Sequence, residues 1–492
     1  MKIRLATTAF LAAVLLFLFF AAMRRNLNHD EHQFIAPAAV LIEGAQPYRD
    51  FPLFHLPNLV FLYAALFRVF DHPFLTARCF SVFCAFVTAA LIFRECWKSS
   101  LLTETHWRFA ASTAPVLLLL LDPLCLFTTG RAWNHDSTAL LIVLATILQV
   151  SAARRDSLPR AAASAICAGL AAGTRLTCAP ILIPLWISNW LLPSPFTRRT
   201  QFAAIYFLAA TAALAPSLYY LCAQTEPFLF GNFEFPRLRL LDPENERIRK
   251  TMNPLRKLRF FFKEVALPSL PLFLAFIALG IRRPGKSSFA TALVLGILPF
   301  ALLGCFAPSR YQYQHFYIII PLLILSVAYG ISAVTRSAKW ATFWLTFPVV
   351  IYSLSYIYKF STDLLPGPSK DWFPTRVANI ATQFRSQNPH GPILTLAPIY
   401  PIEAGLQTYP EFATGPFAWK SVRFVPPERR ERLHLIAPGD LETFLAAKPP
   451  GAILTGVEDP ALEKPLVDYS RAHQFSPVNL GKERTLWLPA AR

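Results

Sequence analysis

The sequence predicts a mainly α-helical, polytopic membrane protein of about eleven transmembrane helices, followed by a small extracytoplasmic α/β domain at the C-terminus. Hydrophobic residues make up 54% of the 492 residues and charged residues only 15%, whereas a soluble domain averages about 45–50% and about 25%. The hydrophobic residues are gathered in runs that approach the length of about 20 residues needed to cross a bilayer. From about residue 361 onward the chain is instead rich in proline and mixed in charge.

The first apolar run, Leu5 to Met23, is expected to be a retained transmembrane helix. It is longer than the roughly 7–15 apolar residues of a signal peptide, and no small-residue cleavage site follows it. Further runs predict the other spans, at 74–93, 109–127, 137–153, 161–174, 176–192, 201–222, 265–281, 288–306, 315–334 and 340–357. The apolar segment from Leu56 to Phe70 is too short for a span, and we expect it to lie on the outer leaflet as an interfacial helix.

Basic residues decide the expected orientation, because cytoplasmic loops carry an excess of Lys and Arg. One side of the membrane receives Lys2, Arg4 and the clusters Arg94/Lys98/Arg108, Arg154/Arg155/Arg160, Arg198/Arg199, Arg282/Arg283/Lys286 and Arg336/Lys339. The N-terminus is therefore expected in the cytoplasm. The other side receives loops 24–73, 128–136, 223–264 and 307–314, with everything after about residue 359. Loop 223–264 departs from the rule, since it carries nine Lys and Arg on the outer side.

Two domains are expected. Residues 1–358 form the transmembrane domain, which includes a first outer loop, 24–73, with interfacial helices. Residues 359–492 form the extracytoplasmic domain. In this domain the short apolar runs that follow Gly391 and Gly451 are bounded by turn residues and predict β-strands. Roughly 130 residues are enough for a small α/β domain.

Composition also argues against two other classes of function. The net charge is +18, which could indicate nucleic-acid binding, but the basic residues are scattered through short loops between apolar runs. Membrane topology and contact with anionic lipid headgroups explain them better. The eight cysteines form no Cys-x-x-Cys pair and mostly lie in or beside apolar runs, so they predict neither a disulfide framework nor a cysteine metal site.

The outer loops hold an unusual number of polar residues close to the membrane. Asp30 and Glu31 follow directly after the first span, and ionisable groups at a membrane boundary usually have a function. The other candidates are His29, His32, Tyr48, Arg49, Asp50 and His55 in the first loop, Arg131, His135 and Asp136 in the second, Arg175 between two spans, and Arg310, Tyr311, Tyr313 and His315 in the turn 308–315. A carboxylate can deprotonate an acceptor, and arginines can hold a phosphate.

Each of these residues also has a purely structural interpretation. The acidic pair could cap the following helix, and Arg131 could pair with Asp136 and fix its loop. Arg175 could extend to lipid headgroups. His29 and His32 have the spacing of metal ligands, but histidines at an interface are more often solvated. The convergence of all these groups on one face of the membrane favours a functional site.

An ordered set of segments resembles the GT-C membrane glycosyltransferases, such as the protein O-mannosyltransferases and the lipid A aminoarabinose transferases. The set consists of Asp30 to Phe51, His55 to Pro57, Ala77-Arg78, Arg131 to Asp136, Gly169 to Arg175 and His315 to Pro321. The similarity covers roughly residues 1–335. Arg175 falls where the family often has Lys, so the basic group is kept but changed.

The resemblance implies a glycosyltransferase in a bacterial inner membrane that takes a polyprenyl-phosphate-linked sugar and passes it to a glycan, lipid or protein acceptor on the outer, periplasmic side. Asp30 would be the general base, and Glu31 would assist it or bind a divalent metal such as Mg or Mn. Arg175, with Arg131 or Arg310, would hold the donor phosphate. Asp136, Tyr48, Arg49, His55 and His315 would support the site or the acceptor.

The alternative class is a multi-pass transporter or lipid flippase. Transporters favour charged or broken helices at mid-membrane and paired repeats. This sequence concentrates its ionisable groups in outer loops and shows no internal repeat, so the enzyme is the preferred hypothesis.

Overall fold

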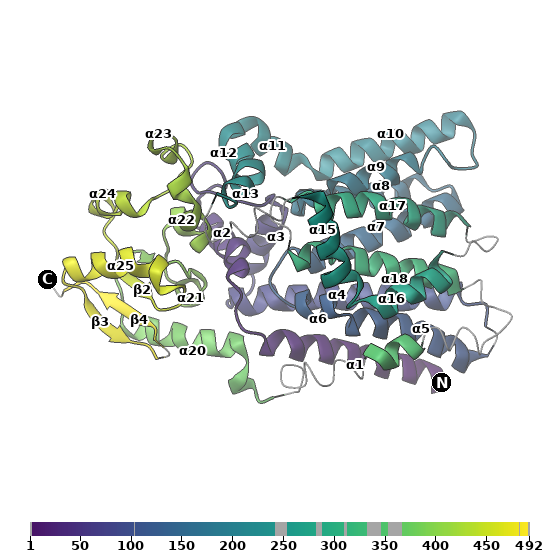
Figure 1. Ribbon diagram of the computed structural model, residues 1–492, viewed down its shortest axis with the longest axis horizontal. Coiled ribbons are helices and arrows are strands. Elements are labelled where there is room, and N and C mark those ends of the chain that lie inside the picture. The colour runs from purple at the N-terminus through teal and green to yellow at the C-terminus, as the bar shows by residue number, and fades with distance from the viewer. Residues whose placement is uncertain are drawn as a thin grey trace.

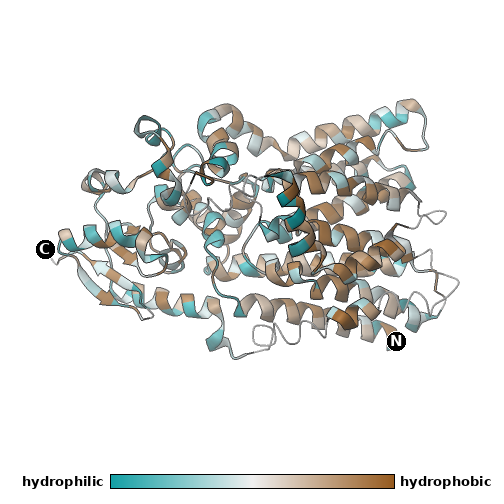
Figure 2. Cartoon of the chain, in the orientation of Figure 1, coloured by the Kyte–Doolittle hydropathy of each residue, from teal (hydrophilic) through white to brown (hydrophobic). Residues whose placement is uncertain are grey.

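The protein consists of a bundle of apolar helices and a mixed α/β part at the end of the bundle opposite the N-terminus (Figure 1). The computed structural model describes residues 2–102, 104–241, 253–281, 288–308, 312–331, 346–352, 367–481 and 483–490. Hydropathy follows this division. The bundle is predominantly hydrophobic, whereas the α/β part alternates between hydrophilic and hydrophobic residues (Figure 2).

The long helices of the bundle are α1 (Lys2–Arg24), α4 (Pro73–Ser99), α5 (Thr105–Leu121), α7 (His135–Arg155), α8 (Leu158–Thr174), α10 (Phe196–Ala213), α17 (Ser288–Phe306) and α18 (Ile319–Gly330). Helix α8 packs closely against both α7 and α10. Its sequence is rich in Ala and Gly, and small residues let helix backbones approach one another. A Cβ atom at Gly169 would lie 2.7 Å from the carbonyl oxygen of Ala210, so this contact requires glycine.

Five of the described helices are long and apolar enough to cross a membrane, and up to seven spans result if two bent helix pairs each count as one. This is fewer than the eleven spans expected from the sequence. Helices α5 and α8 have 17 residues each and are shorter than an ideal span. Helix α10 is followed by α11 (Ala215–Ala223) at an angle of 59°. The expected span 340–357 lies mostly outside the described residues.

Interruptions of the helical backbone explain several of the short helices. Helix α8 ends because Arg175 has an extended backbone, with φ −146° and ψ 109°. The next segment runs as a 3-10 helix, η2 (Leu176–Ile181), and then as α9 (Leu182–Ile187), with Pro180 and Pro184 inside it. The expected span 176–192 is therefore a shorter, irregular helical segment. A similar break separates α15 (Pro254–Phe260) and η5 (Phe261–Ala266) from α16 (Leu270–Ala275) and η6 (Phe276–Gly280), where the two halves are bent by 90°.

The first outer segment forms η1 (His29–Glu31), α2 (His32–Ile42) and α3 (Asn58–Phe67). Asn28 caps η1, since its side chain accepts a hydrogen bond from the backbone N–H of Asp30 at 2.9 Å. The Glu31 carboxylate accepts the N–H of Asn28 at 2.9 Å, which completes a capping box. Helix α3 covers most of the apolar segment 56–70 and packs on α2; its place on the outer leaflet remains a prediction.

A buried ion pair joins this segment to the bundle. Arg78 of α4 donates to both carboxylate oxygens of Glu31, at 3.0 and 2.9 Å, and both side chains are fully buried. The same guanidinium group donates to the backbone carbonyls of Ala22, Arg25 and Asn26, at 2.8, 2.7 and 3.1 Å. Arg78 therefore fixes the end of α1 and the start of the outer segment against α4.

The C-terminal part contains a four-stranded sheet in the order β1-β2-β4-β3. The predicted strands after Gly391 and Gly451 are confirmed as β1 (Ile393–Leu394) and β2 (Ala452–Thr455), which pair in parallel. Strands β3 (Ser476–Asn479) and β4 (Thr485–Leu488) form an antiparallel pair beside β2. The helices of this part are α20 (Phe373–Ser386), α21 (Ile399–Glu403), α22 (Pro416–Ser421), α23 (Pro427–Arg430), α24 (Leu441–Ala447) and α25 (Pro460–Ala472).

The C-terminal part packs directly on the outer segments of the bundle. Helix α21 contacts α2 and α4. The carboxylate of Glu403 accepts the N–H of Phe74 at 3.1 Å and lies 3.0 Å from Nδ1 of His72. The first outer segment and the C-terminal part thus enclose the same end of the bundle.

We predict that Glu31→Gln destabilises the protein by about 3–5 kcal/mol, because it leaves the buried charge of Arg78 without its counter-ion. Thermal unfolding in detergent measures this effect. The matched control is Glu104→Gln, which removes an exposed carboxylate from a pair with His106. Equal melting temperatures for the two variants would show that the buried pair is not a stabilising constraint.

Candidate functional site

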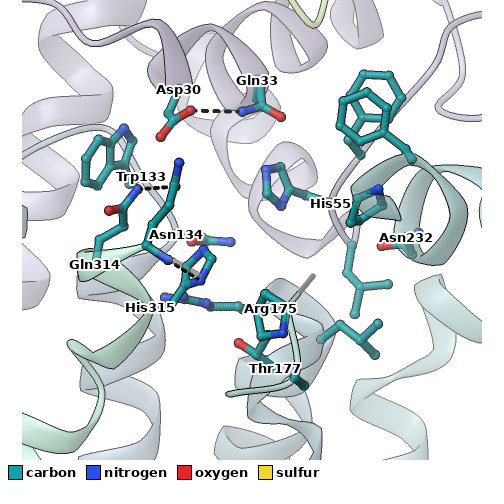
Figure 3. Close-up of a pocket in the computed structure, with 18 of the residues that line it drawn as sticks. Asp30, Gln33, His55, Trp133, Asn134, Arg175, Thr177, Asn232, Gln314 and His315 are labelled. Atoms are coloured by element: carbon teal, nitrogen blue, oxygen red, sulfur yellow. Dashed lines mark hydrogen bonds between the residues drawn. The ribbon is translucent and has the colours of Figure 1, made fainter. Parts of the chain in front are cut away.

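A cavity of about 410 Å³ lies where the bundle meets the first outer segment (Figure 3). Its walls come from the start of the first outer segment, the 54–56 stretch, the turn before α7, the α8–η2 junction, the segment 232–239 and the loop before α18. The polar residues that line it are Asp30, Gln33, His55, Asn134, His135, Arg175, Thr177, Asn232, Arg237, Arg239, Gln312, Gln314 and His315. Five of the candidates named from the sequence are among them: Asp30, His55, His135, Arg175 and His315.

Asp30 is the single carboxylate among the described residues that line the cavity. Its backbone is held by the Asn28 cap, and its Oδ1 accepts a hydrogen bond of 3.4 Å from Nε2 of Gln33 (Figure 3). Nε2 of His29 lies 3.8 Å from the same oxygen, and a quarter of the Asp30 side chain is exposed. The carboxylate is therefore ordered, accessible from the cavity and able to accept a proton.

Arg175 lies on the opposite side of the cavity from Asp30 in the view of Figure 3. The extended backbone that ends α8 directs this residue to the cavity wall, where only 8% of it is exposed. Its guanidinium group makes no side-chain hydrogen bond or ion pair with the described residues. A buried cation without a protein counter-ion is costly, so its donors are available to an anionic ligand.

His55 is positioned by two aromatic residues. Its ring stacks on Phe34 with centroids 4.7 Å apart, and its carbonyl accepts a 2.6 Å hydrogen bond from the hydroxyl of Tyr48. Burial, together with the nearby positive charges of Arg175 and Arg239, lowers the pKa of His55 to about 3. His55 is therefore neutral near pH 7. Tyr48 is buried, has a positive φ of 64° and does not line the cavity.

The other predicted site residues lie elsewhere. Asp136 is buried behind the cavity wall and accepts hydrogen bonds from the Gly130 N–H and the Tyr317 hydroxyl, each at 2.8 Å. Arg131 stands over the ring of Trp133 and donates to the carbonyl of Phe127. No pairing joins Arg131 to Asp136 among the described contacts, so the structural alternative of an Arg131–Asp136 pair is wrong. These residues shape the wall rather than line it.

Another predicted residue, Arg49, is also outside the cavity. Arg49 is exposed and pairs with Asp50, with 2.7 Å between Nη2 and Oδ2. Arg310 lies outside the described residues.

Glu31 does not fit a metal site. One carboxylate oxygen accepts from Arg78 and from the N–H of Ala132 at 2.9 Å, and the other accepts from Arg78 and from the N–H of Asn28. The hydrogen-bonding capacity of both oxygens is thus occupied. Within the described ranges there is also no group of three or more His, Cys, Asp or Glu side chains suited to a metal ion.

Sequence reasoning missed several residues of the cavity wall. Asn134 and Gln314 lie beside predicted residues, but single amides in loops have no distinctive pattern. Trp133 is buried in the wall, and its indole N–H has no hydrogen-bond partner among the described residues. Arg237 and Arg239 belong to the loop whose excess of positive charge broke the topology rule. That excess was the one feature of the sequence that could have identified them.

The fold is shared with solved structures of other proteins. Two structures of the aminoarabinose transferase ArnT from Cupriavidus metallidurans match with a TM-score of 0.61 and 12% identity, one bound to undecaprenyl phosphate and one in the apo state. The first match covers 98% of this chain and 97% of that one, and the second covers 99% and 98%.

A weaker likeness is to an oligosaccharyltransferase from Archaeoglobus fulgidus, with a TM-score of 0.47 and 12% identity over 77% of this chain and 56% of that chain. No family model matches the sequence, and no curated protein sequence matches it. The likeness to known proteins is therefore one of fold.

We predict that acid destabilises the protein through its buried neutral histidines. Burial lowers the pKa of both His32 and His55 from 6.5 to about 3. Between about pH 3 and pH 6.5 these histidines bind protons in the unfolded chain but not in the folded chain. The free energy of unfolding therefore rises with pH. Stability should be complete above about pH 7.5 and should fall as the pH drops through 6.5 toward 3.

Melting temperatures measured from pH 4.5 to 8 test this dependence. The double variant His32→Gln/His55→Gln should show a flatter profile than the parent protein. The control is His106→Gln, whose side chain is mostly exposed. Parallel profiles for the parent and the double variant would contradict the assignment.

Proposed function

We propose that this chain is a membrane glycosyltransferase that transfers a sugar from a polyprenyl-phosphate-linked donor to a glycan, lipid or protein acceptor. The observation that carries the proposal is a cavity in which one ordered carboxylate, Asp30, lies across from a buried arginine, Arg175, that has no side-chain hydrogen bond or ion pair with the described residues. The GT-C fold supports it, since one ArnT structure of the same fold is bound to undecaprenyl phosphate.

The proposed reaction assigns one role to each of these two residues. The acceptor attacks the anomeric carbon of the sugar while Asp30 accepts the proton of the acceptor group. The bond between the anomeric carbon and the phosphate oxygen breaks, and the polyprenyl phosphate leaves with that electron pair. Negative charge therefore develops on the phosphate, where Arg175 stabilises it in a partly dehydrated site.

The surrounding residues position the reactants. Neutral His55, with His315, Asn134 and Gln314, supplies hydrogen-bonding groups suited to sugar hydroxyls. Glu31 acts through the backbone, because its contacts with Arg78 and Asn28 fix the turn that carries Asp30. We assign no step to a metal ion.

The proposal also includes the side of the membrane on which the site lies. We infer a bacterial inner membrane with the N-terminus in the cytoplasm and the cavity and C-terminal part on the periplasmic side. The basis is the distribution of Lys and Arg along the sequence. A lipid-linked donor in the outer leaflet then reaches the cavity directly, because the cavity lies where the bundle meets the first outer segment.

We predict that Asp30→Asn lowers kcat by at least about 100-fold with little loss of stability, because it removes the general base and keeps the shape of the side chain. The assay is sugar transfer from a polyprenyl-phosphate donor by the purified protein. The control is Asp71→Asn, an exposed carboxylate outside the cavity. Full activity of Asp30→Asn would overturn the assignment of the base.

For Arg175→Gln we predict a loss of about 10- to 100-fold in kcat/KM for the donor, because a charge-assisted phosphate contact disappears. Arg175→Lys should recover part of this loss, since it keeps the positive charge. Arg376→Gln, on α20 and away from the cavity, removes one charge as a control. Donor kinetics that do not change in Arg175→Gln would support the simple alternative of headgroup contact.

A further inference from the structure

A short helical segment runs across the bundle instead of along it. It consists of α15 and η5, which together cover Pro254–Ala266, and we call it the crossing helix. The helical segment that follows it, α16 with η6, is bent away from it by 90°. Figure 1 shows the crossing helix running across the direction of α1 and α4. A helix with this direction lies parallel to the surface of a membrane that the bundle spans.

One face of the crossing helix packs on the end of the bundle that carries the cavity. Phe261 is buried there, with its ring centroid 5.9 Å from that of Phe306 and 5.2 Å from that of Phe316. These two rings belong to the end of α17 and to the turn just before α18. Val265, one turn further along, is fully buried. The crossing helix is therefore held at the level where the long helices end.

The crossing helix also borders the cavity. Nζ of Lys257 donates to the backbone carbonyls of Phe306 and Pro308, at 2.9 and 3.0 Å. Ala307 and Pro308 line the cavity. A molecule bound to the exposed face of the crossing helix therefore lies close to this wall.

An apolar stripe runs along the exposed face of the crossing helix. Residues three, four or seven positions apart lie on the same side of a helix, and Leu255, Leu258 and Phe262 have this spacing. Their exposed fractions are 74%, 43% and 58%. Three large apolar side chains are thus presented together on the outside of the protein.

A basic stripe runs beside the apolar one. Arg256, Arg259 and Lys263 repeat the same spacing one position further along, and all three are exposed. Lys263 lies 3.2 Å from the carboxylate of Glu264, but both side chains of this pair are largely exposed, and such a pair contributes little energy. The sequence of the crossing helix contains four basic residues and one acidic residue, so its exposed face is positively charged.

The two stripes together have the chemistry of a helix that lies in a membrane interface. Along the crossing helix hydrophilic and hydrophobic residues are mixed (Figure 2). In an interfacial helix, apolar side chains enter the boundary between headgroups and acyl chains, while Lys and Arg attract anionic headgroups. The apolar stripe alone would suit any lipid, whereas the basic stripe selects lipids with a net negative charge.

We propose that the exposed face of the crossing helix is a binding surface for anionic phospholipids of the surrounding bilayer, in the leaflet next to the cavity. The occupant is a lipid because the helix lies at the level where the bundle ends and presents apolar and basic residues side by side. The inference concerns the membrane and does not depend on the proposed function. It gives a role to four of the nine Lys and Arg of loop 223–264, which the topology rule leaves unexplained.

Native mass spectrometry of the purified full-length protein tests this surface, because it reports bound lipids and oligomeric state in one measurement. The probes are phosphatidylglycerol and phosphatidylcholine with identical acyl chains. The test variant is R259Q/K263Q, and R259K/K263R keeps both charges. The control K464Q/R471Q removes two exposed basic residues of α25 in the C-terminal part. Melting temperatures equal to that of the parent protein show that the variants keep the fold.

The parent protein is expected to bind at least one phosphatidylglycerol more tightly than phosphatidylcholine. R259Q/K263Q should lose at least about tenfold in affinity for phosphatidylglycerol, since two charges near an anionic headgroup disappear. Its affinity for phosphatidylcholine should not change, because the apolar stripe is intact. R259K/K263R and K464Q/R471Q should bind both lipids like the parent protein.

Three results would overturn the inference. The first is an affinity for phosphatidylglycerol that is the same in R259Q/K263Q and in the parent protein. The second is a parent protein that binds the two lipids equally well. The third is a dimeric parent protein that R259Q/K263Q converts to monomers without any change in lipid binding, which would assign the surface to a second copy of the chain. Sugar transfer is not measured, so each of these results leaves the proposed function standing.

Discussion

The buried ion pair between Glu31 and Arg78 determines where the chain turns as it leaves the first helix. Arg78 binds the Glu31 carboxylate and three backbone carbonyls at the end of α1, and Glu31 also caps η1 and holds the N–H of Ala132. Neighbouring residues of a helical turn face different directions. With Glu31 directed into the protein toward Arg78, Asp30 faces the cavity. Two adjacent carboxylates thus have separate roles: one maintains the turn and the other is available for chemistry.

The sequence predicted the helical membrane part, two strands of the C-terminal sheet and five residues of the cavity wall, including Asp30 and Arg175. It did not predict the number of long helices, because breaks such as the extended Arg175 depend on packing rather than on hydrophobicity. It also grouped Glu31 and Asp136 with the cavity residues. Their hydrogen-bond partners, Arg78 and Tyr317, lie 47 and 181 residues away, and contacts over such distances cannot be read from residue patterns.

The segment of residues 225–239, here called the basic arm, shows how an exception to the topology rule can carry information. Loop 223–264 has nine Lys and Arg on the side where few are expected, and topology alone does not explain them. The structure gives two of them a position at the cavity. It also pairs the arm's acidic residues with Arg429 of the C-terminal part. The C-terminal part therefore supports one wall of the cavity.

The central claim is that a lipid-linked phosphate binds between Asp30 and Arg175. An experimental structure of the protein with undecaprenyl phosphate, determined by cryo-electron microscopy in a lipid nanodisc, tests it most directly. The account predicts that the phosphate contacts the guanidinium group of Arg175 inside the cavity, with the Asp30 carboxylate facing the space beside it. Phosphate density outside the cavity, or an ion pair between Arg175 and Asp30 that fills it, would contradict the account.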